Sequence, residues 1–248
     1  MTVERRDLPS RSRPRYAAGM IFVHEIHEVA AGKMEAFGEA VRTEWRPLLE
    51  ARGDARLCWY WELTHGTGPS YQIVTITAVR DWPTWVALAG PTTDPRLREW
   101  QQRSWTLRRD ATSKVLIPTA WSPLREIDLA APPATATTDT PTMYLHDTGW
   151  PFPGKLEEYA GALGSIFYPQ VQQSRMIEIA ACWTTAPGTG KHHEVVLLQK
   201  ILDWERFSQL LTRGEQGAQK GGWMEAGLRY RDRWESKLLR CARWSPRQ

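Results

Sequence analysis

The chain has 248 residues, a formal net charge of +4 and an apolar content of 42%. This length allows one large domain or two small ones with packed cores. No apolar run reaches the roughly 18 residues of a membrane helix, and three dispersed cysteines favour neither zinc nor a disulfide framework. A cytoplasmic location is therefore expected, and no membrane partner.

An arm rich in arginine opens the chain. Five arginines between residues 5 and 15 outnumber the acidic residues there, and the apolar stretch of a secretory signal is absent. We expect residues 1–19 to form a flexible basic arm, and neither a nucleic-acid-binding arm nor a transit peptide. The arginines between residues 96 and 109 predict a solvated helix face, so no nucleic-acid partner is expected.

Residues 20–47 predict a strand, a turn and an amphipathic helix. Along the strand, His24 points to one face and Glu25 and Val23 to the other. Because neither face is cleanly polar, we expect helices to cover one face and a second sheet the other. Apolar residues then recur at helical spacing, and Gly53 is the expected end of the helix.

The following elements complete a β-α-β-β-α-β order, which is that of a ferredoxin-like fold. Strands are predicted at residues 55–63 and 71–79, helices from Asp81 and from residue 94 or 95, and a last strand at residues 114–121. Strict alternation places Leu57, Trp59 and Trp61 on one face of their strand.

The whole pattern occurs twice. His24 and His146 are 122 residues apart, and further equivalent pairs keep this offset, which becomes 123 after one inserted residue. The two Trp-Ser-Pro segments, at 121–123 and 244–246, show the later offset. We therefore predict a first ferredoxin-like unit at 20–124, a linker rich in Pro, Thr and Ala at 125–141, and a second ferredoxin-like unit at 142–248.

Both units carry a family resemblance at their first strand and turn. The matching residues are Ile21, Phe22, Gly32 and Lys33 in the first unit, and Met143, Tyr144, Pro153, Gly154 and Lys155 in the second. With the Asp-Trp start of the second helix and the Trp-Ser-Pro end, they resemble NIPSNAP domains of the dimeric α/β-barrel superfamily. The resemblance implies an α+β protein whose two tandem units pack sheet to sheet as a pseudo-symmetric α/β barrel.

The superfamily implied by this resemblance includes cofactor-free monooxygenases, isomerases, cyclases, haem proteins and ligand sensors, so it does not select a function. The family's acid and arginine on the first strand are replaced by Val23 and Glu25, and by Leu145 and Asp147. We therefore transfer no role from that arginine and expect a different ligand, or a ligand in a different charge state.

Five residues are candidates for acid–base catalysis, namely His24, Glu25, His146, Asp147 and Glu178. Neighbours on a strand point to opposite faces, so neither His–acid pair forms a dyad, and one member of each is expected to face a pocket. The alternative is that these groups are satisfied within the core or, for Glu178, solvated.

Fourteen tryptophans are the outlier of the composition. We expect most to fill the cores and a minority to wall a pocket for an apolar or aromatic small molecule. The predicted substrate-binding residues are Trp59, Trp61, Trp85, Tyr144 and Trp183.

No cofactor or metal is predicted. Phosphate-binding and dinucleotide-binding motifs are absent, as is a serine-nucleophile elbow. His65, His192 and His193 lie at predicted turns without a third ligand at metal-binding spacing, and haem ligation is an alternative for them.

These features predict a cofactor-free acid–base enzyme of isomerase, lyase or cyclase type. The alternatives are a cofactor-free monooxygenase, a non-catalytic NIPSNAP-like binding or scaffold protein, and a haem-binding protein. The units differ at Trp59 against Ala181, and at Arg56 against Glu178, so one site is expected and not two. A homodimer of fused barrels is a further hypothesis.

Overall fold

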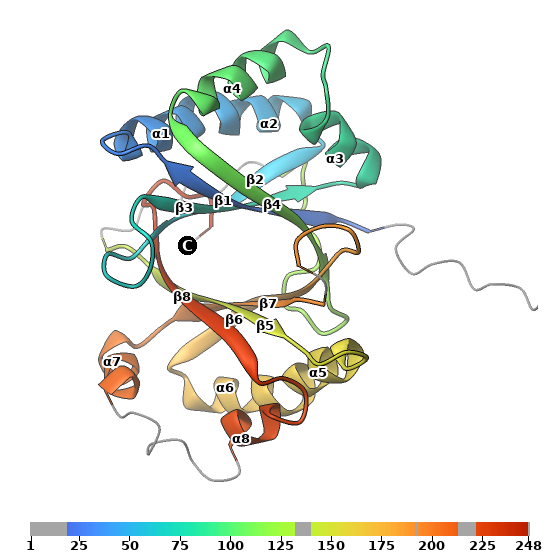
Figure 1. The fold of residues 1–248 in the computed structure, drawn as a ribbon, viewed down its shortest axis with the longest axis vertical. Helices are drawn as coiled ribbons and strands as arrows, with labels where there is room; N and C mark the ends of the chain where they lie inside the picture. The colour runs from blue at the N-terminus through green and yellow to red at the C-terminus, as the bar shows by residue number, and fades with distance from the viewer. Residues whose placement is uncertain (1–18, 132–139, 192, 213–221, 248) are drawn as a thin grey trace, which may run out of the picture.

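A computed structural model describes residues 19–131, 140–191, 193–212 and 222–247. Within these ranges eight strands close into one barrel, and the helices cover its two outer sides (Figure 1). None of the helices described there is long and apolar enough to cross a membrane.

The two halves contain the same succession of elements. The first comprises β1 (Ile21–Val29), α1 (Met34–Ala40), a π-helical turn (Val41–Trp45), α2 (Arg46–Arg52), β2 (Ala55–Leu63), β3 (Gln72–Val79), α3 (Trp82–Ala89), α4 (Pro95–Trp105) and β4 (Arg108–Pro118). The second comprises β5 (Met143–Trp150), α5 (Leu156–Ala162), a π-helical turn (Leu163–Phe167), α6 (Tyr168–Ser174), β6 (Ile177–Thr185), β7 (Val195–Ile201), α7 (Trp204–Thr212), α8 (Trp223–Gly227) and β8 (Arg233–Cys241).

The strand order around the barrel is β1-β3-β2-β8-β5-β7-β6-β4. Each half supplies four neighbouring strands in ferredoxin-like order, and all pairs are antiparallel. The halves join through β2–β8 and β4–β6, with only three residue pairs in each join. The predicted α+β fold of two ferredoxin-like units, packed as a pseudo-symmetric barrel, is confirmed.

The duplication extends to irregularities of the backbone. The two π-helical turns start at Val41 and Leu163, which are 122 residues apart. Tyr71 and His193 have positive φ angles of 63° and 58° and keep the same offset. Gly53, the predicted end of the first helix, has a φ of 67°. These shared distortions follow from the common fold and not from strand or helix propensity alone.

A β-bulge corrects the predicted faces of β2. The register with β3 shifts between Leu57 and Trp59, and an equivalent shift occurs in β6 between Ile179 and Ala181. Because the bulge adds one residue, Leu57 packs under the helices while Trp59 points into the barrel. The prediction that Leu57 shares a face with Trp59 is therefore wrong. The last strand of the unit also begins earlier than predicted, at Arg108.

The two Trp-Ser-Pro segments cross to the opposite half. Ser122 accepts a hydrogen bond from the Cys182 backbone N–H at 2.9 Å, and Ser245 accepts one from Tyr60 at 3.1 Å. The indole of Trp121 donates to a carbonyl in α5 at 2.7 Å. Each half therefore supplies a partner for a strand of the other half, which strengthens the two short joins of the barrel.

Candidate active site

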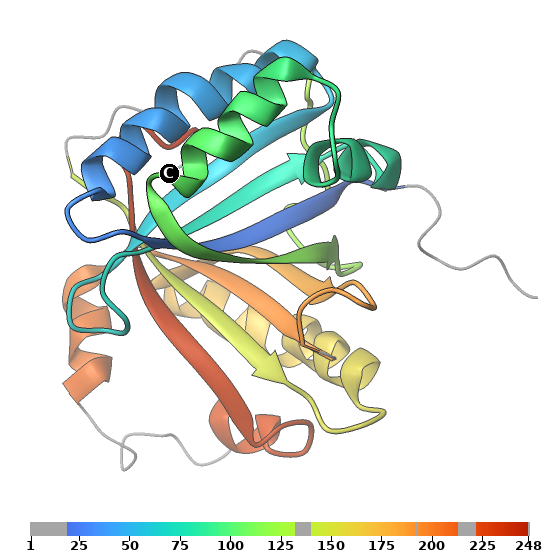
Figure 2. The ribbon, with the colours of Figure 1, turned by 45° about the horizontal axis from the view of Figure 1, so that its top comes forward.

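The helices of the first half lie over the outer face of β1, β3 and β4 (Figure 2). A large cavity lies between these helices and that face of the sheet. Its volume is about 590 Å³, which is within the usual range for small-molecule sites. Apolar side chains form most of its wall, among them Val23, Phe37, Val41, Trp45, Val79, Trp85, Leu88, Leu97 and Trp100. This apolar wall suits an aromatic or apolar ligand.

Polar groups on the sheet face this apolar space. They are Glu25 and His27 on β1, Thr75 and Thr77 on β3, and Arg108 at the start of β4. Residues two apart on a strand share a face, which is why Glu25 and His27 both point towards the helices. The hydroxyl of Thr77 is buried and lacks a hydrogen-bond partner among the described residues. This hydroxyl is available to a ligand.

The hydrogen bonds of His27 define its tautomer. A terminal nitrogen of Arg108 lies 2.7 Å from Nδ1, and Thr75 Oγ1 lies 3.1 Å from Nε2. Arginine only donates, so Nδ1 accepts and Nε2 carries the proton. Burial, assisted by the charge of Arg108, lowers the pKa of His27 to about 3. His27 is therefore a neutral support for Arg108 and not a base.

Glu25 is the remaining acid–base group of the cavity. No hydrogen bond or ion pair to its carboxylate occurs among the described residues. Burial raises the pKa of Glu25, and the positive charge of Arg108 opposes that rise. An apolar site with a carboxyl of raised pKa beside a guanidinium can remove a proton and stabilise the anion that forms.

The equivalent cavity of the second half has a volume of only about 90 Å³. Asp147, Tyr159 and Arg231 stand where the first half has Glu25, Phe37 and Arg108. Gly149 stands at the position of His27, and a Cβ atom on this glycine would lie 2.5 Å from the hydroxyl of Tyr159. The tyrosine hydroxyl therefore occupies space that an imidazole fills in the first half.

That hydroxyl also replaces the function of His27 as a partner for arginine. Arg231 is 3% exposed and donates from Nε to Tyr159 Oη at 2.8 Å. Gln199 and Ser236 donate to the carboxylate of Asp147, at 2.7 and 2.5 Å. The acid and arginine of the second half are thus bound to protein groups in a filled space, whereas the first half keeps an open cavity.

Several predicted site residues lie elsewhere. His24 and His146 point into the barrel, where their ring centroids are 4.8 Å apart. Glu178 is exposed near the start of β6 and lines neither of the two cavities beneath the helices. Asp147 lies in the small cavity of the second half, and only Glu25 lies in the large one.

Four of the five predicted substrate-binding residues form the barrel core. Trp59, Trp61, Tyr144 and Trp183 are at most 2% exposed and pack on one another, with centroid separations of 5.3 to 6.4 Å. They line neither of the two cavities beneath the helices, so the structure does not bring them together with Glu25. Trp85 is the member of the set that lines the large cavity.

The prediction omitted four of the polar groups named above, namely His27, Thr75, Thr77 and Arg108. His27 carried a usable signal, because it shares the outward face with Glu25. Arg108 carried none, since it falls in a stretch read as a solvated helix and reaches His27 only through the pairing of β4 with β1.

The cavity residues do not fit an axial ligand for haem. His27 is the imidazole that lines this space, and both of its nitrogens already have partners. His65 lies at the β2–β3 turn, His193 lies in the β6–β7 turn, and His192 is outside the described residues. Across the described ranges there is no group of three or more His, Cys, Asp or Glu suited to a metal ion.

Comparisons with known proteins place the fold. No family model and no curated protein matches the chain. A candidate monooxygenase from Fusobacterium nucleatum subsp. nucleatum has a similar structure, with a TM-score of 0.62 and 8% identity, over 90% of this chain and 93% of that chain. An anthrone oxidase-like protein matches with a TM-score of 0.61 and 9% identity, over 91% and 92%.

Structures of NIPSNAP family proteins are also among the matches. One from Agrobacterium tumefaciens is 25% identical and covers 43% of this chain and 99% of that chain, with a TM-score of 0.35. The dimeric α/β-barrel fold implied by the sequence resemblance is confirmed by the matches that span nine-tenths of the chain.

Proposed function

We propose that the chain is a cofactor-independent enzyme that removes a proton from an apolar or aromatic substrate, with Glu25 as the base. The observation that carries this proposal is the combination of Glu25 and Arg108 in an apolar cavity of about 590 Å³. The suitable substrate has a carbonyl or phenolic oxygen next to the acidic proton, because such a molecule delivers negative charge to one oxygen atom.

In the proposed reaction, the Glu25 carboxylate takes a proton from the carbon beside a carbonyl. The electron pair of that C–H bond forms a C=C bond, and the carbonyl π electrons move to oxygen, which becomes an enolate. The guanidinium of Arg108, supported by His27, stabilises the oxygen anion. When the substrate also has a C=C bond next to the acidic carbon, the anion is a dienolate. Return of the proton from Glu25 to the far carbon of this dienolate then shifts the double bond and completes an isomerisation without any cofactor.

A deuterium-exchange experiment tests this proposal. The probe is 2-tetralone, an aromatic ketone whose C1 protons are acidic, dissolved in D₂O with the full chain. Proton NMR follows the loss of the C1 signal. We expect exchange faster than in buffer, and a loss of about 100-fold or more for Glu25→Gln, the usual scale for removing a general base.

The second half provides a matched control. Asp147→Asn makes the same acid-to-amide change at the equivalent position, and we expect it to leave the exchange rate unchanged. Because the pKa of Glu25 is raised, the rate should increase with pH through a midpoint above the usual value of about 4.3 for glutamate. Equal losses in both variants, or no exchange above buffer, would contradict the proposal.

Oxygenation is the second candidate, because the same electron-rich anion can react with O₂ when the substrate is an anthrone or a related phenol. The candidate monooxygenase and the anthrone oxidase-like protein share only the fold with this chain. Oxygen uptake with anthrone as the probe, abolished by Glu25→Gln, would favour this candidate over isomerisation. Absence of both exchange and uptake would favour a non-catalytic binding or scaffold protein.

A further inference from the structure

Another cavity, distinct from the two beneath the helices, lies at one end of the barrel interior, on the face of β1 opposite to the candidate active site. Its volume is about 300 Å³, and residues of β1, β4, β5 and β8 line it together with Gly190, Lys191 and Glu194. His24 lies here, next to Glu25 in sequence but on the other side of the sheet. This space is therefore separate from the candidate active site.

Two buried imidazoles form the inner end of the cavity. His24 and His146 are each 2% exposed, and within the described chain Nε2 of His24 and both nitrogens of His146 lack a hydrogen-bond partner. Burial is the main cause that lowers the pKa of both, to about 3 for His146, so both rings are neutral at pH 7. Each neutral ring has one donor and one acceptor, and buried polar groups are normally satisfied.

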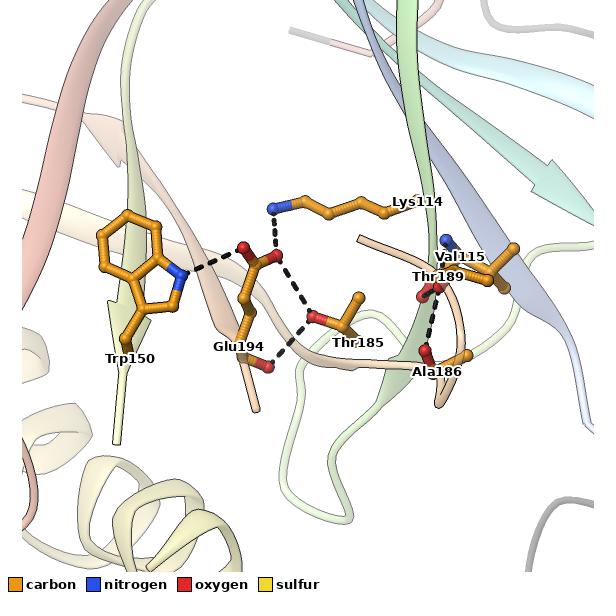
Figure 3. Close-up of polar contacts among 7 residues, drawn as sticks. All are labelled: Lys114, Val115, Trp150, Thr185, Ala186, Thr189 and Glu194. Atoms are coloured by element: carbon orange, nitrogen blue, oxygen red, sulfur yellow. Dashed lines mark hydrogen bonds and ion pairs between the residues drawn. The ribbon is translucent and has the colours of Figure 1, made fainter. Parts of the chain in front are cut away.

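The outer part of the cavity holds an ordered set of charges, part of which is drawn in Figure 3. Lys114 donates to Glu194 at 2.8 Å, and the indole of Trp150 donates to the other oxygen of Glu194 at 3.0 Å. Glu194 is only 4% exposed, so Lys114 and Trp150 hold its carboxylate in a fixed position at this end of the barrel.

The lining carries one uncompensated positive charge. Lys237 pairs with Glu235, and Lys114 pairs with Glu194. Lys191 forms none of the ion pairs found among the described residues and lies 5.3 Å from the centre of the Trp150 ring. Arg233 lies 4.7 Å from the same ring and adds positive potential. A single anion is therefore attracted to the mouth of the cavity.

We propose that this barrel-end cavity binds a small monocarboxylate, with the carboxylate at Lys191 and the rest of the molecule extending towards His24 and His146. One negative charge matches the excess charge of the residues that line the cavity. Ile26 and Trp150 supply apolar surface for the body of the ligand. The site is independent of the function proposed for Glu25.

Imidazole ¹⁵N NMR of the full chain tests the site, with benzoate as the probe and benzamide as its neutral analogue. The signals of His24 and His146, assigned through His→Gln variants, report the barrel-end cavity, and that of His27 reports the candidate active site. We expect benzoate to shift the His24 and His146 signals to saturation and benzamide to bind at least about tenfold more weakly, as loss of a charged hydrogen bond implies.

Variants separate recognition from general charge effects. Lys191→Gln should weaken benzoate binding about tenfold, whereas Lys33→Gln, which removes an exposed lysine from the β1–α1 turn, should not change it. Unchanged His24 and His146 signals up to about 10 mM benzoate, far above a submillimolar dissociation constant, would overturn the proposal. So would equal binding of benzamide, or a shift confined to His27, which would place benzoate in the other cavity.

Discussion

Replacement of Asp147 by asparagine should change how stability depends on pH. Burial raises the pKa of Asp147 from 3.8 to about 6, against the opposing effects of Ser236, Arg231 and Gln199. The native state therefore holds the proton more tightly than the unfolded chain. The stability contributed by this proton is complete below about pH 4 and is lost as the pH rises through 6.

The size of the effect follows from these two pKa values. A shift of one pKa unit is worth about 1.4 kcal/mol, so the contribution of Asp147 falls by about 2 kcal/mol between pH 4.5 and pH 8. An amide does not titrate, and it can accept from Gln199 and donate to Ser236 in the same place. Relative to wild type, Asp147→Asn should therefore gain about 2 kcal/mol of unfolding free energy over that interval.

Urea unfolding, followed by circular dichroism at pH 4.5, 6 and 8, measures this difference. Glu25→Gln should change in the same direction, because burial also raises the pKa of Glu25. A difference between Asp147→Asn and wild type that is independent of pH would refute the reasoning. A difference that falls with pH would mean that Arg231 lowers the pKa of Asp147 more than burial raises it.

Two further predictions use the duplication as an internal control. Tyr159→Phe should lower the free energy of unfolding, measured in urea, by about 1.5–3 kcal/mol, because buried Arg231 loses its acceptor. Phe37→Leu, at the equivalent position, removes no acceptor, so any loss of stability that it causes comes from packing. Equal losses in the two variants, with Arg231 bound to another acceptor in a crystal structure of Tyr159→Phe, would contradict this prediction. Gly53→Ala should destabilise by about 1–2 kcal/mol because its φ is positive, and Arg175→Gly should stabilise by up to about 1 kcal/mol at the equivalent position. Stability changes of the opposite sign in thermal melts would show that the left-handed backbone conformation does not determine the stability effect at these two positions.

Periodicity and repetition were sufficient to predict the order of the elements. The outward face shared by Val23 and Glu25 follows from alternation along a strand, and both residues line the large cavity. Alternation failed at Trp59, because a β-bulge is set by pairing with a neighbouring strand and leaves no mark in the strand's own sequence. The interpretation of the barrel-core aromatic residues as a pocket wall has a different cause, because it rests on the number of tryptophans, and composition does not distinguish a core from a cavity.

The difference in volume between the two cavities could not be predicted from the sequence, for a related reason. Gly149 and Tyr159 look unremarkable apart, and only their close approach shows that one hydroxyl fills the place of His27. Arg108 and His27 are 81 positions apart and meet through the register of β4 on β1. The packing of side chains in the folded structure therefore decides which half keeps an open cavity.

Fluorine NMR of 6-fluoro-2-naphthol with the full chain tests the single open site most directly. Trp100 and Trp223 line the large and the small cavity at equivalent positions, so their phenylalanine variants are matched. We expect one bound resonance, which moves in Trp100→Phe as the ring current of the indole changes and stays in place in Trp223→Phe. Two bound resonances of equal intensity, or a response to Trp223→Phe alone, would contradict a single aromatic site beside Glu25 and Arg108.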